Sequence, residues 1–125
     1  MRIDATHQAK ITVERSRFFA VLAPAADEAA IKKLLNRRRA TVKKAVHHCW
    51  AARVAGPGGQ IQEFARDDGE VGRPGHKMLA LLQHHDIEGV VVVSRVFGGV
   101  KLGPAGVGRA FKQAAVAALI EAGIR

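Results

Sequence analysis

Four consecutive valines at positions 90–93 constrain the fold of this chain more than any other feature. They lie within the strand-like stretch at residues 87–97, and a strand that is buried on both faces shows such a continuous apolar run in place of alternation. We therefore expect a sheet whose central strand covers this stretch. The 125 residues suffice for one domain with a single core, because domains commonly contain about 100–150 residues. The expected domain covers residues 1–125.

Patterns on either side of that strand supply the remaining elements. Asp27 stands at an N-cap position and Glu28 in the following turn, which favours a helix that runs to about Ala45. The string GPGG at 56–59 separates two further strands, and this is a hairpin signal. No repeat or linker interrupts the chain, which fits one compact α/β unit. The expected order is strands at 8–14 and 17–22, a helix at 28–45, strands at 47–55 and 61–66, a helix at 76–84, the central strand, and a last helix that ends near Ala122.

The helix expected at 28–45 has an apolar side and a basic side. Its larger apolar residues share one arc of a 3.6-residue wheel, which would pack on the sheet. Arg38 falls inside that arc, so either the helix bends there or the side chain extends along its stem to solvent. No acidic residue occurs between Glu28 and Glu63, and the segment 32–44 would extend about 18 Å across several phosphates. The basic side comprises Lys32, Lys33, Arg37, Arg39, Lys43 and Lys44.

The net charge of the protein indicates which kinds of molecule it attracts. Lys and Arg number 20 against 11 Asp and Glu, which leaves a formal charge of +9, and such a field attracts nucleic acid or an anionic membrane surface. The alternative is that the chain is a small basic protein without a specific polyanionic partner. No apolar run approaches the roughly 18 residues that span a bilayer, and the N-terminus lacks the apolar stretch of a signal peptide. With its single cysteine, the protein is expected to be cytoplasmic, without a membrane partner.

Five glycines lie between the central strand and the last helix. Backbone N–H groups and a helix N-terminus in this position can hold a phosphate. Lys101 and Arg109 would add charge, although the spacing matches neither the Walker loop nor GxGxxG. In the structural alternative, glycines permit positive φ and close packing of the helix on the sheet. The five are Gly98, Gly99, Gly103, Gly106 and Gly108.

Asp67, Asp68 and Glu70 place three carboxylates within four residues. Such a cluster can hold Mg²⁺ or supply an acid and a base. An Asp-Gly turn that leads into a helix would use the same residues structurally. No strong ligand spacing accompanies the cluster, so the structural interpretation is favoured over a metal site.

Two histidines and the cysteine follow one another at the start of a predicted strand. His47 and Cys49 would point to one face and His48 to the other, so zinc would need two more ligands on the first face. We expect Cys49 to be a small buried residue, and we expect the domain to fold without a metal or cofactor. The other candidate ligands, which lack the spacing of a zinc site, are His76, His84 and His85.

Four strings together resemble the IMPACT/YigZ family. They are SRFFAVLAP at 16–24, AVHHCWAARV at 45–54, DDGE at 67–70 and SRVFGGVKLGPAGVGRAF at 94–111. The last string is the most specific because its order of ring, glycine and basic positions is hard to reach by chance. The chain departs from the family pattern at Val96 and Ala52, where the family commonly has aromatic residues, and in the string VGRPGHK after Glu70.

The resemblance implies an α/β (α+β) two-layer sandwich similar to domain 2 of the fifth small-subunit ribosomal protein, with a mixed sheet and helices on one face. Longer bacterial relatives carry a ferredoxin-like second domain, which is expected to be absent here. Eukaryotic members act in translational control through a starvation-sensing kinase pathway. Related folds also serve in translation factors and small-molecule kinases, so the fold alone does not determine the function.

Three functions stay open. The leading hypothesis is an RNA- or ribosome-associated binding protein that contacts phosphates through Lys101, Arg109, Arg95 and the basic helix. Because aromatic residues are few, with Trp50 and five Phe, recognition of backbone or shape is favoured over base stacking. An enzyme acting on a phosphorylated or nucleotide substrate would need the carboxylates and the glycine segment in one cleft. The third possibility is a regulator that binds other proteins. In the first two cases the expected functional centre is residues 98–109.

Overall fold

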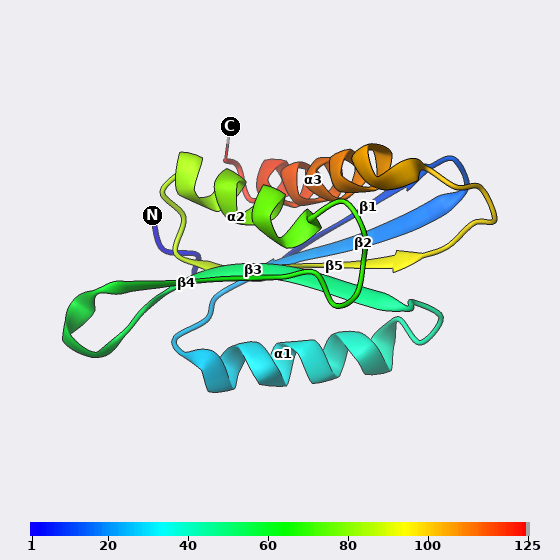
Figure 1. The fold of residues 1–125 in the computed structure, drawn as a ribbon. Coiled ribbons are helices and arrows are strands. Elements are labelled where there is room, and N and C mark those ends of the chain that lie inside the picture. Colours follow the sequence, from blue (N-terminus) through cyan, green and yellow to red (C-terminus); the bar gives the residue numbers. More distant parts are fainter. Residues whose placement is uncertain (125) are drawn as a thin grey trace.

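The computed structural model describes residues 1–124 (Figure 1). The valine run forms the central strand of a five-stranded sheet, as predicted, and the strand order is β1-β2-β5-β3-β4. None of the helices in the described residues is long and apolar enough to cross a membrane. The strands are β1 (His7–Val13), β2 (Ser16–Ala23), β3 (His47–Ala55), β4 (Ile61–Arg66) and β5 (Gly89–Val96), and the α-helices are α1 (Glu28–Thr41), α2 (Pro74–His84) and α3 (Gly103–Glu121).

All four ladders of the sheet are antiparallel. The α+β class is therefore confirmed, whereas the expected mixed sheet is wrong. The chain forms two hairpins, β1–β2 and β3–β4, and these are joined only through β5, which pairs with β2 on one side and with β3 on the other. Strands that run in the same direction, such as β2 and β3, are always separated by a strand of opposite direction.

Helices cover both faces of the sheet (Figure 1), so the expected arrangement of two layers with helices on one face is also wrong. α2 and α3 pack on one face and α1 packs on the other. Val91 and Val93 belong to the core under α2 and α3, while Val90 and Val92 belong to the core under α1. Because successive strand residues alternate between the faces, a strand between two helical layers needs an uninterrupted apolar run.

The position of the helices follows from the two crossover connections, β2–α1–β3 and β4–α2–β5. Each joins two strands of the same direction across one intervening strand. A rotation of the sheet by 180° about the axis perpendicular to it makes the two connections run in the same direction across the strands. Two crossovers of the same hand would therefore place α1 and α2 on the same face. They lie on opposite faces, and the crossovers therefore have opposite hands. One of them is left-handed, although about 98% of comparable connections are right-handed.

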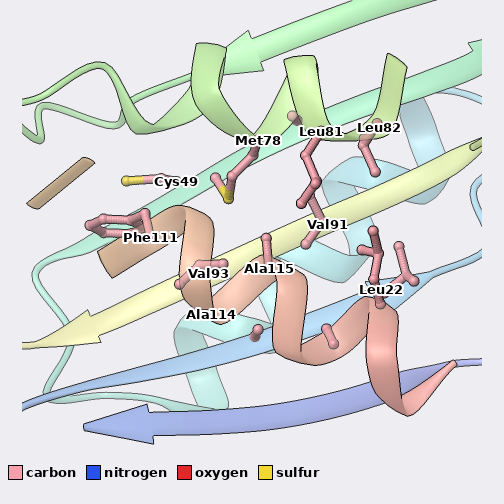
Figure 2. Close-up of a cluster of buried hydrophobic side chains, with 14 of the residues drawn as sticks. Leu22, Cys49, Met78, Leu81, Leu82, Val91, Val93, Phe111, Ala114 and Ala115 are labelled. Carbon is pink, nitrogen blue, oxygen red and sulfur yellow. The ribbon is translucent and has the colours of Figure 1, made fainter. Parts of the chain in front are cut away.

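The larger core lies between the sheet and the helices α2 and α3 (Figure 2). Phe18 of β2 meets Phe111 of α3 edge to face, with ring centroids 5.1 Å apart, and Met78 of α2 fills the adjoining space. Cys49 is fully buried in this core, as predicted. Burial, assisted by the neighbouring carboxylates, raises the pKa of its thiol, so the residue stays neutral.

The start of α1 and the ends of α2 and α3 agree with the prediction, whereas the end of α1 and the starts of α2 and α3 differ from it. Asp27 is the N-cap, and its Oδ1 accepts a hydrogen bond from the backbone N–H of Ala30 at 2.9 Å. The helix ends at Thr41 and not near Ala45; Thr41 and the residue after it are β-branched and have low helix propensity. α3 already begins at Gly103, so the three last glycines of the glycine segment lie within the helix.

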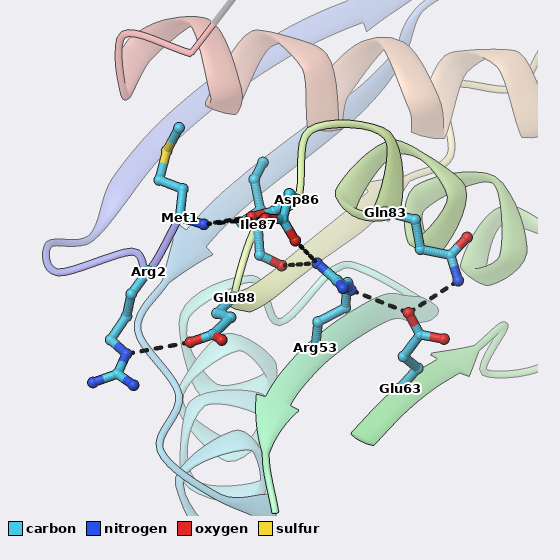
Figure 3. A network of polar contacts seen from close by, with 8 residues as sticks. All are labelled: Met1, Arg2, Arg53, Glu63, Gln83, Asp86, Ile87 and Glu88. Carbon is cyan, nitrogen blue, oxygen red and sulfur yellow. Dashed lines mark hydrogen bonds and ion pairs between the residues drawn. The ribbon is translucent and has the colours of Figure 1, made fainter. Parts of the chain in front are cut away.

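Charged residues pair with one another where β5 begins (Figure 3). Arg53 of β3 is central, because its Nε donates to Glu63 at 3.1 Å and its Nη1 donates to Asp86 at 3.2 Å. Glu88 pairs with Arg2 at 3.3 Å. The acidic side chains Glu63, Asp86 and Glu88 are thus paired at this end of the sheet. Much of the unpaired positive charge lies on α1 and at the end of the sheet where β5 finishes.

Candidate nucleic-acid interface

The outer side of α1 carries the densest set of cations. Lys32, Lys33, Arg37 and Arg39 are exposed on the helix, and Lys43 and Lys44 are exposed just after its end. Within residues 1–124, no ion pair involves any of these six side chains. A surface of this kind can follow a nucleic-acid strand because Lys and Arg side chains bind successive phosphates.

Arg38, the basic residue inside the apolar arc of α1, is half-buried, and the helix continues through it to Thr41. Its Nε is shielded from solvent and has no hydrogen-bond partner in the described part of the chain. Burial lowers the pKa of the guanidinium, yet an arginine remains charged at neutral pH.

Arg95, at the end of β5, is enclosed and does not belong to the surface cations. Its Nη1 lies 3.4 Å from Glu70 Oε2, and the two side chains are only 9% and 5% exposed. Its Nε and Nη2 each lie 3.4 Å from Ser16 Oγ, and the guanidinium packs over the rings of Phe18 and Phe97. The phosphate contact expected for Arg95 does not fit this position.

The three carboxylates of the acidic loop have different partners. Asp67 Oδ1 accepts from a backbone N–H in the first turn of α2 at 2.8 Å. Asp68 Oδ2 accepts from a backbone N–H of β3 at 2.8 Å, and Glu70 pairs with Arg95. No group of three or more potential ligands in residues 1–124 is arranged as a metal site. The loop fastens α2 and β5 to β3, in agreement with the structural interpretation.

The residues at the start of β3 divide between the two faces, as strand geometry predicts. The imidazole Nδ1 of His47 lies 2.7 Å from the carbonyl oxygen of Asp68, and Cys49 belongs to the core under α2 and α3. On the opposite face, Nδ1 of His48 lies 2.7 Å from the hydroxyl of Ser94, and this pair is buried. The three side chains therefore do not form a common ligand set.

Lys101 and Arg109 line one open groove of about 350 Å³ between the β1–β2 turn and the start of α3. Gly106 also lines this groove, and Glu14 is its one acidic residue. The structure thus brings together the two cations and the first turn of α3, as expected from the sequence. None of the three carboxylates of the acidic loop lines the groove, so the common cleft required by the enzyme hypothesis does not form there.

Two glycines are required because the backbone of another segment lies against them. A Cβ on Gly98 would collide with the backbone of Arg15, and a Cβ on Gly72 would collide with the backbone of Pro104. Gly98 keeps the chain after β5 against the β1–β2 turn. Gly72 keeps the acidic loop against the start of α3. These positions fit the structural alternative for the glycines.

An aromatic pair on the β3–β4 hairpin was not expected from the sequence. Trp50 and Phe64 lie on the same face as α1 with ring centroids 6.1 Å apart, and the guanidinium carbon of Arg66 is 5.8 Å from each ring. The ladder pairs Trp50 with Arg66 and Ala52 with Phe64. The loop comprises the five residues 56–60, one more than the GPGG string, and a slip of one residue would move Phe64 to the other face, so counting outward from the string alone would have missed the pair.

The Impact N-terminal domain family matches residues 14–119. The chain belongs to this family. The matched range contains the acidic loop, the Arg95–Glu70 pair, all four strings that resemble the family and every lining residue of the groove at α3 except Val13.

Relatives of this Impact N-terminal domain come from bacteria and animals. It is 40% identical over 108 residues to an IMPACT family member in the pol 5′ region of Thermus thermophilus, covering 86% of this chain and 56% of that protein. It is 36% identical over 101 residues to YigZ of Escherichia coli, covering 79% and 50%. It is 36% identical over 102 residues to Protein IMPACT of Rattus norvegicus, covering 78% and 32%. The chain thus spans about half the length of the bacterial relatives and a third of the rat protein.

Two solved structures share the fold of this Impact N-terminal domain. A crystal structure of a hypothetical protein superimposes with a TM-score of 0.87 at 32% identity, over 95% of this chain and 59% of that chain. The two-domain translational regulator Yih1 superimposes with a TM-score of 0.62 at 28% identity, over 95% and 47%. In both cases nearly the whole of this chain corresponds to part of a longer protein.

We expect this Impact N-terminal domain to lose stability in acid through His48. The residue is 5% exposed, and burial lowers the pKa of its imidazole below the ordinary value of 6.5, although the Asp68 carboxylate opposes the shift. The unfolded chain therefore binds this proton more readily than the folded chain. The contribution is fully present above pH 6.5 and is lost as the pH falls through the lower folded-state pKa.

Thermal melting at about pH 7.5 and pH 5.5 measures this effect. His48→Gln keeps a group that can bond to Ser94 and should reduce the difference between the two melting temperatures. His84→Gln changes an exposed histidine and serves as the control. An equal loss of melting temperature in the natural chain and in His48→Gln would show that His48 is not the titrating group.

Proposed function

We propose that this domain binds structured RNA, free or on the ribosome, and that it regulates translation through this contact in the cytoplasm without a cofactor. One observation carries the proposal: six exposed cations without ion pairs lie along α1 and just after it, within a stretch that has no acidic residue from 29 to 62. Phosphates are ligands of the matching charge. The description of the similar protein Yih1 as a translational regulator supports the role in translation.

The groove at α3 offers a second contact with the same RNA. Arg17 is exposed and lines an open groove together with Lys43 and Lys44, at the end of the sheet where the β1–β2 turn also lies. The β1–β2 turn also borders the groove that Lys101 and Arg109 line. Positive charge thus extends from the end of α1 around the sheet, and an A-form helix recognised by shape would meet both regions.

Removal of the two cations in the α3 groove tests the second contact. We expect Lys101→Ala with Arg109→Ala to weaken binding of a labelled RNA hairpin by roughly 10-fold at about 0.1 M salt, because two phosphate contacts are lost. The melting temperature should stay unchanged, since both side chains are exposed. Fluorescence anisotropy and thermal melting provide the two measurements. Unchanged affinity would confine the interface to α1, and a collapse of melting would make the residues structural.

A regulator that binds a protein is the second candidate, and one observation favours it. Val46, Val71 and Phe97 are 71%, 52% and 52% exposed. The three residues adjoin, respectively, the start of β3, the Glu70–Arg95 pair and the end of β5, so they lie at one end of the sheet. Phe97→Ser should leave RNA affinity unchanged if this apolar patch serves a separate protein partner. The enzyme alternative has no comparable support, because its carboxylates bond to α2, β3 and β5.

A further inference from the structure

We propose that Trp50 and Phe64, together with Arg66, form a stacking site for an unpaired base of a bound RNA strand. This inference rests on the RNA binding proposed above and names the part of the RNA that reaches the α1 face. The α1 cations would bind phosphates of any sequence, whereas this site accepts a base only where the strand is not paired.

A groove of about 310 Å³ between α1 and β3 borders the site at Trp50, and neither Phe64 nor Arg66 lines it. Its apolar lining includes Trp50, Ile31 and Leu35, and Lys32 and Glu28 lie at the helix side. The groove leaves room next to Trp50 on its α1 side.

The rings of Trp50 and Phe64 lie beside α1 and are not fully buried in the core. α1 packs against β5 and β3, so the part of this face that belongs to β4 extends beyond the helix. Trp50 and Phe64 are half-buried at the border of the smaller core, whose fully buried members are aliphatic. By contrast, the rings of Phe18 and Phe111 are completely buried. The hairpin therefore presents aromatic surface that the core does not use.

The charges around the rings suit a nucleotide. Arg66 is exposed, and its guanidinium packs on both rings, where it can stack on a base or bind a phosphate. Lys32 is exposed on the helix side of Trp50. A base on the rings would thus have one cation on each side for its flanking phosphates. Every base has a π face, so the site should tolerate different sequences.

The occupant is a single-stranded segment and not a duplex. Bases in a duplex already stack on one another, and only loops, bulges and ends offer a base to an aromatic side chain. The scarcity of aromatic residues favours recognition of backbone or shape over base stacking. The hairpin register gathers the one tryptophan and one of the five phenylalanines at one place, which is sufficient for one base.

Trp50 is the only tryptophan of the chain, so its fluorescence reports directly on this site. The natural chain is titrated with an oligoadenylate of about 12 nucleotides, with an RNA duplex of similar length and with heparin, a polyanion without bases. We expect the oligoadenylate to quench the fluorescence. Duplex and heparin should bind to the cations, as measured by their displacement of a labelled RNA hairpin, with little quenching.

Variants separate stacking from charge. Phe64→Leu keeps an apolar side chain and should weaken oligoadenylate binding by about 10-fold or more while duplex affinity stays the same. Arg66→Gln changes an exposed residue and provides a second variant that does not threaten the core. Phe97→Leu, an exposed ring at the end of β5, is the matched control and should have no effect.

The outcomes distinguish this inference from the proposed function. If no RNA binds, both are wrong. If the oligoadenylate and the duplex bind but quench equally, or if Phe64→Leu and Arg66→Gln leave oligoadenylate affinity unchanged, the stacking site is wrong and the basic interface stands. Selective quenching by the single strand together with its loss of affinity in both variants establishes the site.

Discussion

The Glu70→Gln variant should unfold with a free energy about 3–5 kcal/mol below that of the natural chain. Glu70 and Arg95 lie 3.4 Å apart with both side chains less than a tenth exposed. Removal of the carboxylate charge leaves the guanidinium enclosed between Phe18, Phe97 and Ser16 without an anion. An uncompensated buried charge is far more costly than the net contribution of the intact pair. Urea denaturation of the two proteins measures the difference.

A double change and a surface pair serve as controls for this result. Glu70→Gln combined with Arg95→Met removes both charges and should recover most of the loss, because apolar replacement of a buried pair is often neutral. Arg2→Met breaks the Arg2–Glu88 pair, in which Arg2 is 77% exposed, and should cost no more than about 1 kcal/mol. A similarly small cost for Glu70→Gln would mean that water reaches the buried pair.

Lys33→Ala with Arg37→Ala should weaken binding of an RNA hairpin by roughly 10- to 100-fold at about 0.1 M salt. These exposed side chains lie four positions apart on α1, and each lost phosphate contact retains one more counterion on the RNA. The slope of log affinity against log salt concentration should therefore fall by about 2. Titrations at several salt concentrations give both quantities. Binding of the natural chain that is indifferent to salt would contradict the electrostatic interface.

The matched control removes the same charge from the opposite helical layer. Lys77→Ala with Lys112→Ala changes exposed residues of α2 and α3 and leaves α1 intact. We expect a much smaller loss of affinity and little change in the salt slope. Equal losses in the two double variants would indicate attraction to the net charge, without a defined contact surface at α1.

Much of the fold could be predicted because short stretches of the sequence mark individual strands, turns and helix starts. The valines at 90–93 indicate a strand that is buried on both faces, and Asp27 marks the start of α1 by its capping bond. The GPGG string marks the β3–β4 turn. The start of α3 was missed although Pro104 was available as a signal, since proline is favoured in the first turn of a helix.

Other features leave no local trace in the sequence. Hydrophobic periodicity shows that a helix has an apolar side but not which face of the sheet that side covers, so the opposite hands of the two crossovers could not be predicted. Arg95 resembles any other surface cation until the fold brings it to Glu70, 25 positions earlier in the chain. The α1 cations were predictable because exposure follows from their place on the helical wheel.

The central place of β5 also determines the order in which the chain can fold. Each hairpin forms from neighbouring residues, but the sheet that unites them needs the last of the five strands. During synthesis, a nascent chain that lacks residues 89–96 holds two hairpins with exposed apolar faces and no shared hydrogen bonds. Contacts between residues far apart in sequence slow folding, so we expect a nascent chain that still lacks β5 and α3 to be prone to aggregation.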